Sequence, residues 1–327
     1  MSYAGSELVL PALNKRKIAK YLFVWISQEF MVNTILVDPE RVLGRNHKSS
    51  PHQTTISVAG IGVNIRYQNA EVGEILLSRY KEFITEGKAA YNMDAFLDNS
   101  IKILERSKDD LNYPIEIIKK DSITIAASTN FIGEITPKSA KLVYNDSETS
   151  GAIQNFLRVL YSYLCLQNNC VLIHGASVVR NEKGYVFFGP SGSGKTTVCE
   201  LSKDDCVLND DIVIIGQEGK EHYVYGNPFW GEMGNISPNV NQKSRIRGMF
   251  RLIQSEENRI EQVSPGMGAV LLASSVSFCG KSREKYAKIL DYLNDLAKSV
   301  PIHNMRFKKD ASFWGCIDEL EKCSGKV

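Results

Sequence analysis

The sequence has almost no net charge and no long apolar run. Its 327 residues carry 39 Lys and Arg against 37 Asp and Glu, a formal net charge of +2. That balance gives no electrostatic field that would attract nucleic acid or a membrane surface. No stretch reaches the roughly 18 uncharged apolar residues of a membrane-spanning helix. We therefore expect neither nucleic acid nor a membrane among the partners.

Targeting and disulfide signals are also missing. Residues 1–7 lack a basic region followed by an apolar core, so we expect no signal peptide. The seven cysteines are odd in number and scattered, and Cys165 and Cys170 have no second cysteine pair to complete a zinc site. Reduced thiols, several of them in the core, are favoured over a metal or disulfide role, and the expected location is cytoplasmic.

The composition is that of a folded globular protein. Hydrophobic residues make up 43% of the chain and charged residues 23%, which argues against disorder. The length suffices for two ordinary domains or one large one. We place a boundary near residue 148, between an α+β N-terminal module (1–148) and an α/β domain (149–327).

The N-terminal part shows elements but no chemistry. The apolar segment 18–26 is compatible with a buried helix or a strand. Residues 54–66 carry β-branched side chains around two glycines and predict two short strands or one bulged strand. No third glycine follows at the spacing of a dinucleotide fingerprint. Residues 94–111 predict an amphipathic helix, and 115–118 and 123–125 predict strands joined by a turn.

The second half alternates helices and strands. Residues 147–164 predict a helix that ends at Asn168-Asn169. Two strands (171–173 and 176–179) are expected to follow, with His174-Gly175 just past the end of the first. The later predictions are a turn at 181–184, a strand at 185–188, a short helix after 196, a strand at 206–215 and a packing helix at 284–297.

The most informative segment is Gly189–Thr196, which fits G-x-x-x-x-G-K-[ST] at every constrained position. It follows a predicted buried strand and opens a predicted helix, the context in which this motif holds phosphate. Its glycines let backbone N–H groups turn toward an anion, and the helix N-terminus adds partial positive charge. We expect Lys195 to reach the terminal phosphates of ATP and the Thr196 hydroxyl to hold Mg²⁺. The predicted nucleotide-binding residues are Gly189, Ser191, Gly192, Ser193, Gly194, Lys195, Thr196 and Thr197.

Two adjacent carboxylates, Asp210 and Asp211, follow the loop closely within an apolar segment. Burying them is costly unless cations or hydrogen-bond donors meet them. A Mg²⁺ ion held by Thr196 is one such partner. A turn at the end of a strand, with both side chains in solvent, is the alternative. Because neighbours on a strand face opposite ways, both can reach one site only near the strand's end.

The combination of His174-Gly175-Ala176, the phosphate loop and Asp210-Asp211 resembles the catalytic domain of bacterial HPr kinase/phosphorylase and its shorter relatives. Phosphoenolpyruvate carboxykinase has a similar loop and Asp pair, but it needs further ligands that this sequence does not display. The resemblance covers roughly residues 150–315. It extends loosely to four later segments, at 226–232, 245–250, 257–261 and 305–314. It implies an α/β fold with a P-loop kinase core of the HPr kinase and phosphoenolpyruvate carboxykinase type, preceded by the α+β N-terminal module.

The resemblance also implies roles for the Asp pair and His174. It makes Asp210 the base that takes a serine proton and Asp211 a Mg²⁺ ligand, although the two roles could be exchanged. His174 is a catalytic candidate that could contact phosphate or orient an aspartate, and a structural histidine is the alternative.

Five later residues are further candidates. Arg245 and Arg247 could bind the transferred phosphate, because guanidinium groups fit phosphate oxygens, or could be solvated arginines on a turn. Phe229 and Trp230 are expected in a core or an interface rather than stacked on a base. Glu232 is a candidate metal or substrate contact.

The sequence thus predicts a kinase that uses ATP and Mg²⁺ to phosphorylate serine on a peptide or protein. A nucleotide-binding regulatory module without phosphate transfer and a small-molecule kinase are the alternatives. An ABC-type transporter ATPase is disfavoured, because no L-S-G-G-Q-like signature follows the loop. The acceptor is not indicated, and a homo-oligomer is suggested only by the resemblance.

Overall fold

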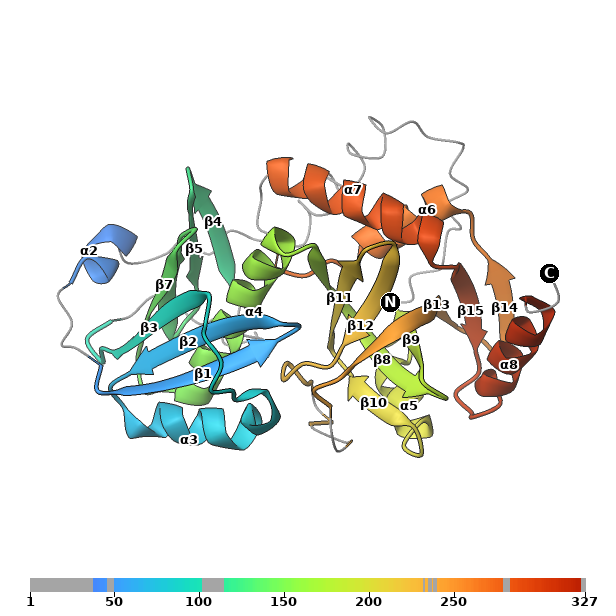
Figure 1. The fold of residues 1–327 in the computed structure, drawn as a ribbon, viewed down its shortest axis with the longest axis horizontal. Coiled ribbons are helices and arrows are strands. Elements are labelled where there is room, and N and C mark those ends of the chain that lie inside the picture. The colour runs from blue at the N-terminus through green and yellow to red at the C-terminus, as the bar shows by residue number, and fades with distance from the viewer. Residues whose placement is uncertain are drawn as a thin grey trace, which may run out of the picture. The chain divides into compact units, whose positions relative to one another are not determined.

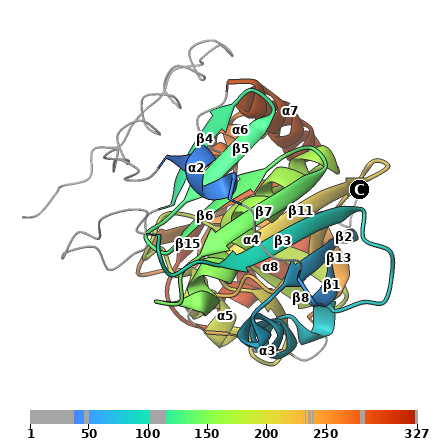
Figure 2. The same cartoon turned by 90° about the vertical axis from the view of Figure 1, so that its left-hand side faces the viewer.

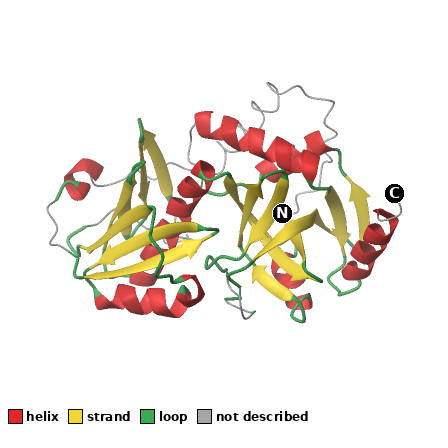
Figure 3. Ribbon diagram, in the orientation of Figure 1, coloured by secondary structure: helices red, strands yellow, loops and turns green. Residues whose placement is uncertain are grey.

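The described part of the chain is a mixed α/β structure with two mixed sheets (Figure 3). It is a computed structural model that describes residues 38–45, 50–101, 115–231, 233–234, 237, 240–278 and 283–324. These ranges lie in one compact unit, Thr34–Val327. Within them, no helix combines the length and apolar character needed to cross a membrane. The segment 18–26 lies outside the described residues.

The first sheet has seven strands in the order β1-β2-β3-β7-β6-β5-β4 (Figure 1). Strands β2, β3 and β7 run parallel, and the other neighbours are antiparallel. The strands are β1 (His52–Val58), β2 (Ile61–Tyr67), β3 (Tyr91–Leu97), β4 (Glu116–Lys120), β5 (Ile123–Ala127), β6 (Phe131–Ile135) and β7 (Ser139–Tyr144).

Two hairpins form where the sequence predicted strands. β1 and β2 are joined by Ala59 and Gly60, whose φ angles of 52° and 75° match the two-residue turn that suits the twist of a hairpin. The predicted pair of strands at 115–118 and 123–125 is β4 and β5, with Asp121 at a positive φ of 54° in their turn. Residues 54–66 are therefore two strands rather than one bulged strand.

The helix predicted at 94–111 is wrong over its first part. Residues 94–97 belong to β3, a central strand that pairs in parallel with both β2 and β7. Tyr91, Met93 and Ala95 are buried at every second position, the period of a strand. Their packing outweighs the helical spacing of the later apolar residues. Residues 102–114 lie outside the described ranges.

Three helices pack against this sheet or beside it. α2 (Pro39–Leu43) packs on β6 and β7, and α3 (Ala70–Arg79) lies along β1 and β2 (Figure 2), followed by the short 3₁₀ helix η1 (Lys81–Phe83). The helix α4 (Thr149–Gln167) contacts β6 and β7 and also β8 of the second sheet. This confirms the predicted helix at 147–164 and its end at Asn168-Asn169. A Cβ at Gly133 of β6 would lie 2.1 Å from the Phe156 ring, so α4 approaches the sheet closely there.

The second sheet has eight strands, five of which pair in a ring: β8, β9, β13, β12 and β11. β10 extends from β8, and β15 and β14 extend from β13. The strands are β8 (Cys170–Arg180), β9 (Lys183–Phe188), β10 (Cys206–Asn209), β11 (Ile212–Glu218), β12 (Glu221–Tyr225), β13 (Lys243–Gln254), β14 (Arg259–Gln262) and β15 (Ile302–Phe307).

Four more helices belong to this half, namely α5 (Lys195–Leu201), α6 (Pro265–Ala273), α7 (Arg283–Ser299) and α8 (Phe313–Ser324). The short helix predicted after the loop is α5, and the packing helix predicted at 284–297 is α7. Three cysteines are buried, as expected: Cys165, Cys170 and Cys199. The six cysteines in the described ranges form no disulfide with one another.

Two corrections concern the strands that carry the site. Residues 170–180 form the single strand β8, so His174 lies in mid-strand rather than past a strand end. β8 changes partner at this point, pairing with β11 up to His174 and with β9 from Gly175 onward. The predicted strand at 206–215 is interrupted at Asp210 and Asp211, which join β10 to β11. Both strands pair with β8, which brings the Asp pair beside His174.

Candidate active site

The phosphate loop joins β9 to α5 in the geometry that its glycines predict. Gly189, Gly192 and Gly194 have φ angles of 151°, 77° and 111°, values that L side chains rarely adopt. A Cβ at Gly194 would lie 2.8 Å from the Phe307 ring, and one at Gly189 would lie 2.9 Å from Ser193 Oγ. The loop therefore packs tightly at Gly189 and Gly194 and leads directly into α5, as a phosphate-binding loop does.

The interior of the loop holds unsatisfied polar groups. Lys195 is 6% exposed, and its Nζ donates to the carbonyls of Gly189 and Pro190, both at 3.0 Å. Ser193 Oγ is buried and has no hydrogen-bond partner among the described residues. Thr196, by contrast, is exposed at the first turn of α5. Lys195 Nζ uses carbonyls of the loop as acceptors, and Ser193 Oγ has no partner in the described part of the chain. The oxygens of a bound phosphate would serve both groups as acceptors.

The remaining loop residues line its outer side. Ser191 and Gly192 are exposed, and Thr197 is half-buried. Gln254, at the end of β13, donates to the Gly192 carbonyl at 2.6 Å and ties the loop to the sheet.

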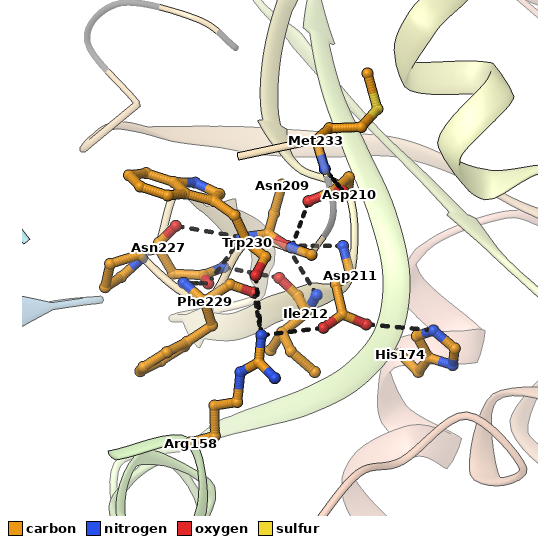
Figure 4. Close-up of polar contacts among 12 residues, drawn as sticks. Arg158, His174, Asn209, Asp210, Asp211, Ile212, Asn227, Phe229, Trp230 and Met233 are labelled. Carbon is orange, nitrogen blue, oxygen red and sulfur yellow. Dashed lines mark hydrogen bonds and ion pairs between the residues drawn. The ribbon is translucent and has the colours of Figure 1, made fainter. Parts of the chain in front are cut away.

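A buried amide network shapes the turn that carries the two aspartates (Figure 4). Asn209 Oδ1 accepts hydrogen bonds from the backbone N–H groups of Asp211 and Ile212 at 2.9 and 2.7 Å. Its Nδ2 donates to the backbone carbonyl and to Oδ1 of Asn227 at 3.2 and 3.0 Å. Asn227 Nδ2 closes the network on the Ile212 carbonyl at 2.9 Å. Sequence reasoning missed both asparagines, although an Asn directly before an Asp pair is a signal for such a turn.

Asp210 is held by the backbone of the segment that follows β12. It is 6% exposed, and its two carboxylate oxygens accept hydrogen bonds from Gly231 N at 2.8 Å and Met233 N at 3.2 Å. A Cβ at Gly231 would come within 2.9 Å of Asp210 Oδ2, so a side chain at this position would crowd the carboxylate.

Asp211 stands between a histidine and an arginine. Its Oδ1 lies 3.4 Å from His174 Nε2, and its Oδ2 lies 3.2 Å from Arg158 Nη2 (Figure 4). The Asp211 side chain is 28% exposed, which leaves it open to a ligand. Its backbone carbonyl accepts a hydrogen bond from Gly175 N at 2.9 Å, which fixes the turn against β8.

Lys195 connects the phosphate loop with this cluster. Burial lowers the pKa of Lys195, and the negative charge of Asp211 opposes that shift. Burial also lowers the pKa of His174; the charge of Lys195 adds to this effect, and that of Asp211 opposes it. Lys195, His174 and Asp211 are therefore close enough to interact electrostatically, and His174 is neutral at pH 7.

Two arginines that sequence reasoning missed converge on the same place. Arg158 of α4 donates through Nη2 to the Trp230 carbonyl at 2.9 Å, and Arg79 of α3 donates to the same carbonyl at 2.7 Å. Burial is the main cause of a lowered pKa of Arg79, and the charges of Arg158, Asp210 and Asp211 also act on it. Arg158 carried no distinct signal, because its neighbours at helical spacing, Gln154, Asn155 and Ser162, are polar as well. Arg79 carried none, because only the folded chain brings α3 to this turn.

The other candidates lie elsewhere. Arg245 pairs with Glu221, and Arg247 lies 3.4 Å from Glu321 of α8. Both are at the start of β13, beside the first residues of β9, whereas the loop follows the last residue of β9. The start of β9 beside these arginines and the end of β9 before the loop are four residues apart, or about 13 Å. The structure does not bring these arginines to the loop.

Phe229 and Trp230 are 0% and 7% exposed. The Phe229 ring packs 5.5 Å from that of Tyr161, and the Arg79 guanidinium lies 5.6 Å from the centre of the Trp230 ring. Their predicted place in a core is confirmed. Glu232 lies outside the described residues.

The donor set suits a metal ion that arrives with a nucleotide. Mg²⁺ commonly takes one or two protein oxygens and completes its shell with water and phosphate. The partly exposed Asp211 carboxylate and the hydroxyl of the exposed Thr196 are donors of this kind. In the described ranges, no group of three or more His, Cys, Asp or Glu side chains could hold a metal without such help.

Comparison with known proteins places the chain in a family. A family model described as SynChlorMet cassette protein ScmC matches residues 143–322, which is more than half of the chain. The chain belongs to the ScmC family. The region that matches the ScmC model contains the phosphate loop, the Asp pair, His174 and Arg158, whereas Arg79 precedes it.

No curated protein matches this ScmC-family chain. Among solved structures, the Hpr(Ser) kinase/phosphatase from Coxiella burnetii is similar over 47% of this chain and 98% of its own. The identity is 8% and the TM-score 0.26, too low for an argument about this chain.

Proposed function

We propose that this chain is an ATP- and Mg²⁺-dependent phosphotransferase that phosphorylates a serine hydroxyl on a peptide or protein. The observation that carries the proposal is that β8 brings the Asp pair to the phosphate loop: Gly175 pairs with Phe188, the residue before the loop, and Gly175 N donates to the Asp211 carbonyl. A generic nucleotide cradle needs no such carboxylate pair. The proposal includes a core of the HPr kinase type, with residues 1–148 as a separate N-terminal module.

The reaction forms a bond between the acceptor oxygen and the γ-phosphorus of ATP. The bond between that phosphorus and the β–γ bridging oxygen breaks, and ADP leaves. The acceptor proton goes to a carboxylate of the site. Such transfers depend mostly on positioning and on neutralising charge, which the loop amides and Lys195 supply.

We assign the proton to Asp210 and the metal contact to Asp211 and Thr196. Asp210 is fixed by two amide donors, and each of its oxygens keeps a lone pair for a hydroxyl. Asp211 is the more exposed carboxylate, and its negative charge acts on Lys195. Mg²⁺ would neutralise phosphate charge there. His174, neutral and 3.4 Å from Asp211, orients that carboxylate.

The test is transfer of radiolabelled phosphate from ATP to a library of serine-containing peptides. Asp210→Asn should lower the transfer rate about 10²- to 10⁴-fold, the usual contribution of a general base. Asp204→Asn is the matched control, because Asp204 is exposed, and this variant should transfer phosphate at the wild-type rate. Equal transfer by the Asp210 and Asp204 variants would remove Asp210 from the mechanism. Asp211→Asn tests whether the two roles are exchanged. If Asp211 is the metal ligand, this variant should need a higher Mg²⁺ concentration for transfer.

Two other outcomes point to other functions. Tight ATP binding without transfer to any acceptor would make the chain a nucleotide-binding regulatory module. ADP release that depends on a metabolite with a free hydroxyl, and not on peptides, would make it a small-molecule kinase.

A further inference from the structure

Arg158 is held loosely on Asp211. The 3.2 Å between Arg158 Nη2 and Asp211 Oδ2 exceeds the roughly 2.7–2.9 Å of a strong charge-assisted hydrogen bond. The same Nη2 makes a shorter contact, 2.9 Å, with the Trp230 carbonyl. Arg158 Nε is buried and has no hydrogen-bond partner among the described residues. A guanidinium with one long ionic contact and an unused buried donor is incompletely satisfied and would gain from a better-placed anion.

Among the described residues, cations outnumber carboxylates around Arg158. The negative charge of Asp211 interacts with three cations, namely Lys195, Arg79 and Arg158. Among the described groups whose charge acts on Arg79, Asp210 is the only other carboxylate. The Trp230 carbonyl holds the two guanidinium groups together by accepting from both, at 2.7 and 2.9 Å. Like charges gathered in a partly buried place are unfavourable unless an anion compensates them.

We propose that Arg158 is a catalytic residue that exchanges partners: it pairs with Asp211 when no nucleotide is bound, and it would contact the transferred phosphoryl group when Asp211 held Mg²⁺ instead. This inference rests on the proposed phosphotransferase function. A planar guanidinium fits phosphate oxygens well, and it stabilises the charge that spreads over them during transfer. Arg158 takes the role that sequence reasoning gave to Arg245 and Arg247, which lie away from the loop. Arg79 is a positioning residue that shares the Trp230 carbonyl.

The exchange makes a prediction for metal binding that does not depend on catalysis. In Arg158→Met, Asp211 has no guanidinium to release. The Mg²⁺ concentration for half-maximal binding of adenylyl imidodiphosphate should therefore fall about two- to fivefold, as expected for a partly exposed ion pair. Arg66→Met is the matched control, because Arg66 Nη2 pairs with Asp94 Oδ2 at 2.6 Å on the first sheet. It should leave the Mg²⁺ requirement unchanged. An unchanged or higher requirement in Arg158→Met would overturn the exchange.

Phosphate transfer tests the second part of the inference. With Mg²⁺ and ATP saturating, Arg158→Met should lower the single-turnover transfer rate about 10²- to 10³-fold, the cost of losing one preorganised donor to developing charge. Arg158→Lys keeps the charge without the planar fork and should recover part of the rate. Thermal melts of all variants separate folding defects from site defects. A wild-type rate in Arg158→Met would refute the phosphoryl contact.

The two failures can be told apart. A wild-type protein that binds the Mg²⁺–nucleotide complex but transfers no phosphate overturns the proposed function, and with it the phosphoryl contact. The Mg²⁺ titration then still decides, by itself, whether Arg158 competes with the metal for Asp211.

Discussion

Replacing Asn209 by alanine should destabilise the turn that carries both aspartates. Asn209 is 1% exposed, and its Oδ1 is the acceptor for the backbone N–H groups of Asp211 and Ile212. Alanine leaves both amides without that acceptor, and a stranded buried donor costs about 1–3 kcal/mol. Asn227 also loses the donor that Nδ2 supplies. We expect the free energy of unfolding to fall by about 3 kcal/mol, taking the lower half of the range for each amide.

Guanidinium chloride unfolding followed by circular dichroism measures this loss. Asn64→Ala is the matched control, because Asn64 makes amide contacts of 3.3 and 3.4 Å with Gln53 and Asn92 near the surface of the first sheet. It should lower the free energy of unfolding by less than about 1 kcal/mol. If Asn209→Ala lowered the free energy of unfolding no more than the control, the amide network would not hold the turn. The network would then not be what places the Asp pair.

Three further predictions concern packing, pH and the loop. Gly133→Ala should cost about 3 kcal/mol of unfolding free energy in a denaturant titration, because its Cβ would lie 2.1 Å from Phe156; a loss below about 1 kcal/mol would contradict the close approach. His222 and His303 are 2% and 5% exposed, and burial lowers the pKa of each below 6.5. The unfolded chain therefore takes up protons first, so stability is full above pH 6.5 and falls below it, by at most about 1.4 kcal/mol per pH unit for each histidine. Denaturant titrations between pH 7.5 and 5 should show that the free energy of unfolding falls less steeply in the double variant His222→Gln/His303→Gln than in the wild type. Equal slopes would refute the assignment of this pH dependence to the two histidines. Gly194→Ala should weaken ATP binding at least about tenfold by calorimetry, because φ is 111° and Phe307 fills the space; unchanged affinity would show that the loop tolerates a side chain.

Local signals in the sequence predicted the local structure well. The strand–loop–helix at Gly189–Thr196, the paired strands β4 and β5 and the helix α4 each follow from residues that touch one another within a short segment. The strand β3 was missed because its position between two parallel partners, which no nearby residue reveals, decides its conformation.

The site was predicted only as far as its motif. Asp210 and Asp211 were found by their charge in an apolar run, but the break between β10 and β11 depends on Asn209 and Asn227, which are 18 residues apart. Arg79 lies 151 residues from the Trp230 carbonyl that it contacts, and no local pattern encodes such a meeting. Arg245 and Arg247 had suitable chemistry, but the parallel register of β13 and β9 places them at the other end of the strand from the loop.

The acceptor that gathers Arg79 and Arg158 is a main-chain atom, the carbonyl oxygen of Trp230. Substituting the indole cannot delete that oxygen, so the acceptor itself does not depend on which side chain Trp230 is replaced by. Its position does not tolerate changes of chain length, because one residue inserted or removed between Pro228 and Gly231 would shift the carbonyl and also the amide that binds Asp210. In an active relative of this protein, the number of residues between Pro228 and Gly231 is therefore a stricter requirement than the identity of the aromatic residues among them.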